Sequence, residues 1–124
     1  MNILNNHVSI LLILFNVYKE YISNLKNLTA LGADDNHILF VANEIETLTS
    51  LTTLNLADNV LQNVPISICN LTNLTALNLE NNHLQDLPDE YSSLTKLRAI
   101  YLNDNDISEI PRFLFNITSL HELR

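Results

Sequence analysis

The chain repeats itself every 23 residues, and this period constrains the fold more than any other feature of the sequence. Four complete copies and the start of a fifth occupy residues 28–50, 51–73, 74–96, 97–119 and 120–124. In each complete copy the first, fourth, eleventh, fourteenth and twenty-first positions are aliphatic, and the ninth is asparagine. A copy this short cannot bury its own leucines, so successive copies must stack into one continuous core.

The start of each copy has the pattern of a β-strand with one buried face. Apolar residues at the fourth and sixth positions alternate with small or polar residues, which is a period of two. We therefore expect one short parallel strand per copy, with Leu54, Leu77 and Ile100 in register on neighbouring strands. A turn and a looser return segment would follow each strand.

The asparagine of the ninth position has a structural explanation. After the strand the chain turns inward, and the backbone groups there lose contact with water. A buried carboxamide offers donors and an acceptor that satisfy such groups. We therefore predict a structural asparagine ladder, not a ligand site, for Asn36, Asn59, Asn82 and Asn105. The prolines of the fifteenth position would lie where the chain leaves the strand and needs no N–H donor.

These columns resemble the leucine-rich repeat family in its common 23-residue form, LxxLxLxxNxLxxLPxxIxxLxx, over residues 28–124. The resemblance implies an α/β repeat solenoid. In this leucine-rich repeat arc a short parallel β-sheet lines the concave face, and irregular or short helical segments form the convex face. The pair Leu87-Pro88 is similar to repeats of Ras-interacting and scaffold-type members.

Residues 1–27 fit the repeat less well. They are interpreted as a partial or degenerate first repeat that begins inside a strand, with Met1 and Ile3 on the fourth and sixth positions. Its return segment would be longer than the others, and helical spacing indicates a short helix there, through Phe15, Tyr18, Ile22 and Leu25. The alternative is an N-terminal cap that is not a repeat. The apolar stretch 8–15 is too short for a membrane helix.

The fifth copy holds only five residues, so we expect the array to be part of a longer one. Leu120 and Leu123 would then lie on an unprotected edge in the 124-residue chain. An open edge strand invites pairing with another chain. We therefore expect self-association when this chain is studied alone.

In this family the partner usually meets the concave face, so the outward-facing strand positions hold the candidate binding residues. Carried over by position, these are Asp35, Asn55, Asp58, Asn78, Glu80, Arg98, Tyr101, Asn103 and Asp104. Tyr101 beside Arg98 is the best candidate anchor, because tyrosine and arginine dominate binding hot spots. The acidic residues could meet a basic partner, and the simpler explanation is a solvated face.

Charge and composition exclude several classes of function. Fourteen acidic residues against six basic ones give a net charge of −8, which disfavours nucleic acid as a partner. A protein partner with a basic patch is favoured instead. A single glycine leaves no phosphate-binding loop, and no Cys or His cluster has metal-ligand spacing. We expect no catalytic residue, no metal and no cofactor.

The sequence thus predicts a non-catalytic protein–protein interaction module or scaffold of intracellular signalling. With Cys69 as its one cysteine the chain forms no internal disulfide, and the paired cap cysteines usual in secreted members of the family are absent, which favours the cytoplasm. A receptor ectodomain or secreted binder is the alternative, favoured by Asn-x-Ser/Thr sequons at Asn27, Asn70, Asn73 and Asn116. A regulatory repeat segment of a larger enzyme is a third interpretation.

Overall fold

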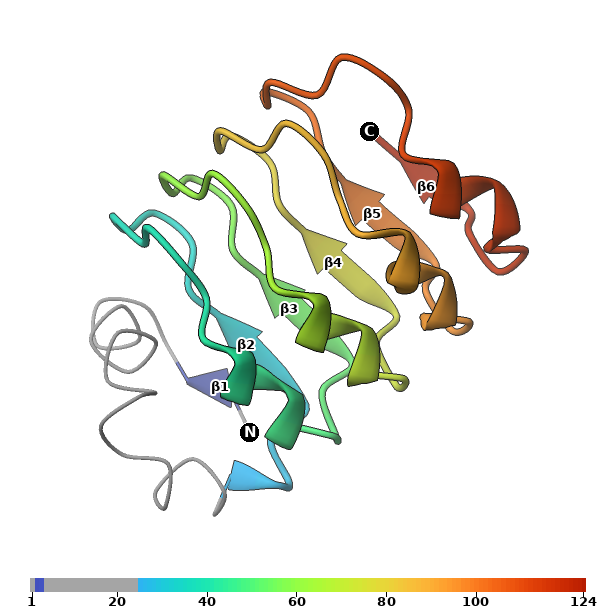
Figure 1. Cartoon of the computed structure of the whole chain (residues 1–124). Helices are drawn as coiled ribbons and strands as arrows, with labels where there is room; N and C mark the ends of the chain where they lie inside the picture. The colour runs from blue at the N-terminus through green and yellow to red at the C-terminus, as the bar shows by residue number, and fades with distance from the viewer. Residues whose placement is uncertain (1, 4–24) are drawn as a thin grey trace.

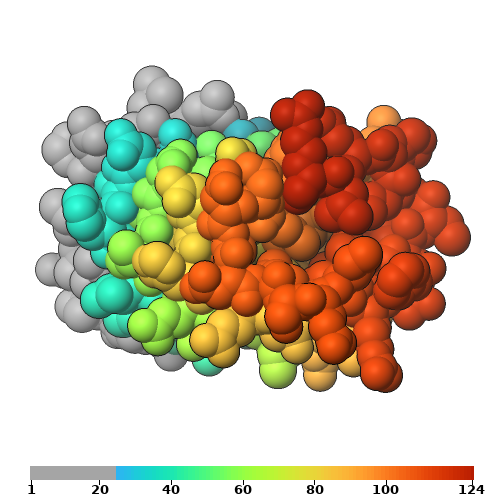
Figure 2. Space-filling model, turned by 90° about the horizontal axis from the view of Figure 1, so that it is seen from above, coloured from blue at the N-terminus to red at the C-terminus, as the bar shows by residue number. Residues whose placement is uncertain are grey.

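The computed structural model describes residues 2–3 and 25–124, which form a stack of coils around one parallel sheet (Figure 1). The six described strands follow chain order across the sheet: β1 (Asn2–Ile3), β2 (Ala30–Gly32), β3 (Thr53–Asn55), β4 (Ala76–Asn78), β5 (Ala99–Tyr101) and β6 (Glu122–Leu123). The space-filling view shows the coils arranged in sequence order from one end of the molecule to the other (Figure 2). Each coil therefore contacts mainly its two neighbours.

The register of the strands is the one that the leucine columns predict. Leu31 pairs with Leu54, Leu54 with Leu77, and Leu77 with Ile100. Leu54, Leu77 and Ile100 are fully buried, and the residues two positions later, such as Leu56 and Leu79, are buried with them. In β2 to β5 the outward neighbours are half-buried, so this part of the sheet has one face in the core and one toward solvent.

The return segments are short 3-10 helices on the side opposite the sheet: η3 (Asn43–Thr47), η4 (Ile66–Asn70), η5 (Asp89–Ser93) and η6 (Arg112–Asn116). The last three begin directly after Pro65, Pro88 and Pro111. Each of these prolines lacks an N–H, but its carbonyl accepts the first hydrogen bond of the helix, as from the Ile68 N–H at 3.2 Å. The expectation of short helical convex segments is confirmed.

In each 3-10 helix the residue at the eighteenth position of the repeat is buried, and in η5 this residue is Tyr91. Its ring lies edge-on to Phe113, with 5.7 Å between ring centroids and an interplanar angle of 71°. Its hydroxyl donates to the Pro65 carbonyl of the preceding coil at 2.8 Å. Burial raises the pKa of Tyr91 far above the ordinary tyrosine value. The protonated Tyr91 hydroxyl therefore links two neighbouring coils through a hydrogen bond.

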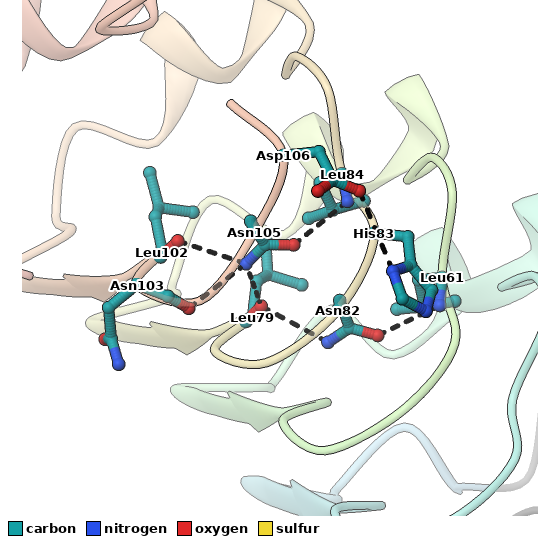
Figure 3. A network of polar contacts seen from close by, with 9 residues as sticks. All are labelled: Leu61, Leu79, Asn82, His83, Leu84, Leu102, Asn103, Asn105 and Asp106. Carbon is teal, nitrogen blue, oxygen red and sulfur yellow. Dashed lines mark hydrogen bonds and ion pairs between the residues drawn. The ribbon is translucent and has the colours of Figure 1, made fainter. Parts of the chain in front are cut away.

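The ninth-position asparagines hydrogen-bond within their own coil and with the coil before it. The Asn82 amide nitrogen donates to the carbonyls of Leu56, Leu79 and Glu80 at 3.0–3.2 Å, and its oxygen accepts from the Leu61 N–H at 3.0 Å. The same set of contacts recurs at Asn59 and, one coil further on, at Asn105 (Figure 3). Asn36 donates to the carbonyls of Ala33 and Asp34.

The register of the first strand differs from the expected one by two residues. Ile3 pairs with Leu31, a residue of the fourth position, although the sequence pattern placed Ile3 on the sixth. A shift of two residues keeps every side chain on the same face of a strand, so apolar alternation cannot distinguish the two registers. Ile3 and Leu31 are 28 residues apart, against 23 for Leu31 and Leu54, so the first return segment is five residues longer. Phe15, Tyr18 and Ile22 of the helix expected there lie outside the described residues, and Leu25, at its end, is described and packs partly buried against the core.

Candidate functional site

The outward positions of the sheet line up into two columns across the coils. The third position gives the column Ala30, Thr53, Ala76, Ala99 and Glu122, and the fifth gives Gly32, Asn55, Asn78 and Tyr101. The third-position residues are mostly small, so the fifth-position side chains stand out from the sheet. Neighbouring members of a column are separated by one strand spacing, about 4.8 Å. Asn55, Asn78 and Tyr101 therefore form one continuous row.

The two asparagines of that row are partly engaged by their own coil. The Asn55 side-chain oxygen accepts from the Ala57 N–H at 3.2 Å, and that of Asn78 accepts from the Glu80 N–H at 3.0 Å. An asparagine that bonds to the backbone two residues later stabilises a turn. Both side chains therefore help the chain to leave the strand.

The acidic column at the eighth position has a backbone role that the sequence interpretation missed. Asp35, Asp58, Asn81 and Asp104 all have a positive φ, between 50° and 56°. This left-handed conformation is costly for most residues, and among non-glycine residues Asn and Asp tolerate it best. The signal was present in the sequence, because the eighth position is Asp or Asn in every complete copy. The backbone conformation of the turn therefore explains why Asp or Asn occupies this position, independently of any role in binding.

Other polar contacts connect neighbouring coils beside the turn. Asn103 donates to the Glu80 carboxylate at 2.6 Å, and Asn81 donates to the Asp58 carboxylate at 2.7 Å. His83 and Asp106, on the tenth position, are 3.7 Å apart and exposed (Figure 3). Amide donors thus lie between the carboxylates of successive coils and allow acidic groups to gather on one side of the sheet.

The side chain of Tyr101 contacts Glu122 of β6 and Arg124, which directly follows that strand. Its hydroxyl donates to the Glu122 carboxylate at 2.9 Å, and this hydrogen bond raises the Tyr101 pKa. The Arg124 guanidinium lies 5.6 Å from the ring centroid and 2.9 Å from Glu122. The Arg98 side chain is exposed, and the described part of the chain gives it no hydrogen bond or ion pair. Arg98 is therefore available to a partner.

Of the nine predicted binding residues, three lie on strands (Asn55, Asn78 and Tyr101), Arg98 directly precedes β5, and the other five follow strands. Ala57, which the same positional rule places on this surface, is buried instead. A separate hollow of about 470 Å³ lies between two return segments and is lined by Asp86, Asp89, Glu90, Glu109 and Arg112 among others. None of the nine residues lines it.

Two negative findings apply to residues 2–3 and 25–124. In this part of the chain, no group of three or more His, Cys, Asp or Glu residues is placed to hold a metal ion. The described helices also include none with the length and apolar character needed to cross a membrane.

Comparisons with known proteins agree with the architecture. A sequence profile described as a leucine-rich repeat region matches residues 13–124. A leucine-rich repeat protein of Leptospira interrogans is similar in structure, with a TM-score of 0.76 and 31% identity over 82% of this chain and 26% of that one. Internalin C2 of Listeria monocytogenes is similar with a TM-score of 0.71 and 30% identity, over 83% of this chain and 44% of the internalin. A second internalin of that bacterium has a TM-score of 0.70 and 29% identity, over 82% of this chain and 29% of the internalin.

The chain spans less than half the length of each of these three structures. A comparison with curated proteins found no significant match.

Proposed function

The chain belongs to the leucine-rich repeat family, and on this premise we propose that its concave face binds a protein partner carrying a basic patch. In this proposal the chain is a protein-interaction repeat module that binds a partner and does not catalyse a reaction. One observation carries the proposal: the outward side chains of β2 to β5 stand in register on an open sheet. These side chains lie outside the buried core, so their exposed atoms are available for contact.

Charge supports a basic partner. Six acidic residues lie on the strand and turn positions of this surface: Asp34, Asp35, Asp58, Glu80, Asp104 and Asp106. Arg98 is the one basic residue on the corresponding positions of the four complete copies. An uneven charge of this kind accelerates the encounter with a basic surface and selects against acidic ones, and it contributes less to affinity. We expect binding that weakens as salt concentration rises.

The small area of this surface limits the affinity with which it can bind a partner. Four neighbouring strands span about 15–20 Å, so this face alone is smaller than the ~800 Å² per partner of a standard interface. Affinity would then depend on a few anchoring side chains. Tyr101 is the large aromatic side chain of the fifth-position row, and tyrosine is enriched among residues that dominate binding energy. We assign it the central contact.

A capture experiment with matched variants tests the proposal. Wild type, Tyr101→Ala, Glu80→Lys and Glu90→Lys are immobilised, and bound proteins are quantified by mass spectrometry. Glu80→Lys and Glu90→Lys make the same charge change, but Glu90 lies exposed on η5, away from the sheet. We expect a set of proteins that Glu90→Lys retains and that both concave-face variants lose. Equal loss with Glu80→Lys and Glu90→Lys, or no loss with either concave-face variant, would refute the proposal.

We further propose that this binding serves intracellular signalling in the cytoplasm, which the lone, half-buried Cys69 supports. A second candidate is an extracellular binder. It is favoured by the four sequon asparagines, all of which are exposed: Asn27, Asn70, Asn73 and Asn116. Glycosidase treatment of protein from its native cells separates the two. A loss of mass would support the extracellular candidate, and an unchanged mass would remove it.

A further inference from the structure

The segment between the turn and the 3-10 helix is polar in three of the complete copies and apolar in the first. Its twelfth and thirteenth positions are exposed in all four copies, so exposure is a property of these positions in the repeat. The first complete copy holds Leu39, 65% exposed, and Phe40, 47% exposed. The later copies hold polar residues there: Gln62, Asn63, Gln85, Asp86, Ser108 and Glu109. Adjacent exposed apolar residues at positions that are otherwise polar indicate an interaction surface.

The backbone beside this apolar pair, Leu39 and Phe40, is fixed by the next coil. The pair directly follows Ile38, whose side chain is buried in the core. The Ile38 N–H donates to the Asn59 side-chain oxygen at 3.0 Å, and the Ile38 carbonyl accepts from the Val60 N–H at 3.2 Å. A surface that is already ordered pays less conformational entropy when it binds. The apolar pair is therefore presented on a preorganised part of the coil.

Acidic residues flank the apolar pair on both sides along the chain. Asp34 and Asp35 precede it in the turn after β2, and Glu44 and Glu46 follow it in η3. The copy that contains them, residues 28–50, has no lysine or arginine. The nearest acid on each side is four residues from the pair, which places the Cα atoms within about 14 Å of each other. The apolar pair therefore lies in a negative electrostatic environment.

We propose that the apolar pair docks a protein segment in which a bulky apolar side chain is flanked by lysine or arginine. The apolar side chain covers the exposed parts of Leu39 and Phe40, and the basic side chains meet the flanking carboxylates. A second copy of this chain would bring like charges together at this surface, and an anionic membrane would be repelled. The pair lies outside the concave face, so the proposal does not rest on the function assigned to that face.

A peptide of this chemistry tests the proposal. The probe is a fluorescein-labelled lysine peptide, in which a central leucine and phenylalanine are flanked on each side by lysines. One control peptide replaces the lysines with glutamates, and the other replaces the two apolar residues with serines. Fluorescence anisotropy measures the binding of each peptide to the 124-residue chain. We expect the lysine peptide to bind, and both control peptides to bind about tenfold more weakly or less.

A matched double variant locates the contact. Leu39→Gln with Phe40→Asn gives the first complete copy the residues that the second copy holds at these positions, so the repeat accommodates them. We expect this variant to bind the lysine peptide about tenfold more weakly than wild type, because it loses two partly exposed apolar contacts. Circular dichroism confirms that the variant is folded.

Ile66→Asn is the control for a general loss of apolar surface. Ile66 is 54% exposed on η4, and the first complete copy holds Asn43 at the same position. This variant should bind the lysine peptide like wild type. Tyr101→Ala, which removes the anchor assigned to the concave face, should also bind it like wild type, so the two proposals can fail separately.

Several results would overturn the proposal. One is a lysine peptide that does not bind, or that binds wild type and the double variant equally. Another is a serine or glutamate peptide that binds as well as the lysine peptide. Self-association in sedimentation velocity that the double variant abolishes would assign the apolar pair to contacts between copies instead. Flotation with phosphatidylcholine vesicles that the double variant abolishes would assign it to a membrane.

Discussion

Removing the Asn82 carboxamide should cost stability through one particular backbone group. Three carbonyls accept from its amide nitrogen, and each has a second donor. The Leu56 carbonyl also accepts from the Asn59 amide nitrogen, and the Leu79 carbonyl from the Asn105 amide nitrogen. The Glu80 carbonyl also accepts from the Asp58 N–H. The Leu61 N–H is different, because the Asn82 oxygen at 3.0 Å is its one acceptor in the described structure. Asn82→Ala therefore leaves one buried donor without a partner.

The size of the effect follows from that count. A buried N–H without an acceptor costs about 1–3 kcal/mol. The missing carboxamide, at a residue only 4% exposed, also leaves a small void. Together they predict a loss of about 2–4 kcal/mol in the free energy of unfolding. Asn82→Asp should lower the free energy of unfolding more than Asn82→Ala does. A carboxylate keeps the hydrogen bond from the Leu61 N–H, but it places negative charge against three carbonyl oxygens.

Urea unfolding followed by circular dichroism measures the loss. Asn63→Ala is the matched control, because Asn63 is exposed and the same substitution there should change stability by less than about 0.5 kcal/mol. Hydrogen exchange of the Leu61 amide gives a local readout, which should accelerate more than global unfolding explains. If Asn82→Ala unfolds at the same urea concentration as Asn63→Ala, then the carboxamide does not hold the coils together and the reasoning fails.

Two further perturbations have expected outcomes. Burial raises the Tyr91 pKa far above the ordinary value of 10.0, so above that pH the unfolded chain releases a proton that the folded chain keeps. Stability should be unaffected below about pH 10 and fall above it by about 1.4 kcal/mol per pH unit, and Tyr91→Phe should remove this dependence in urea titrations. Equal slopes for both proteins would contradict it. At Asp35, with φ 55°, glycine should be tolerated, whereas Asp35→Val should lower the thermal midpoint through a loss of about 1–2 kcal/mol. Equal midpoints for the two Asp35 variants would show that the backbone conformation does not select this residue.

The stacking of coils and its register could be predicted from the sequence because the repeat is local. Each coil meets mainly the coil before and the coil after it, so a period of 23 residues places Leu54 beside Leu77 without any knowledge of the rest of the chain. The two-residue error at Ile3 has the same origin. Where the period is broken, the alternation of apolar residues indicates the buried face but not the partner residue.

The candidate site was less predictable. Its residues could be assigned to the outward face by position, but position does not reveal what each side chain already contacts. Tyr101 was chosen as a candidate anchor from its residue type and position, and nothing in the sequence indicated that Glu122, 21 residues later, accepts a hydrogen bond from its hydroxyl. The aspartates of the eighth position were interpreted as charge, whereas their positive φ shows a requirement of the turn.

Sequence alone determined which residues form the core, how the coils stack and which face is left outward, because these depend on spacing along the chain. Only the tertiary structure decided which outward groups are engaged by a neighbouring coil and which remain free. Those contacts form across strands, between atoms a few ångströms apart and tens of residues apart in sequence. Their geometry arises only when the coils are assembled.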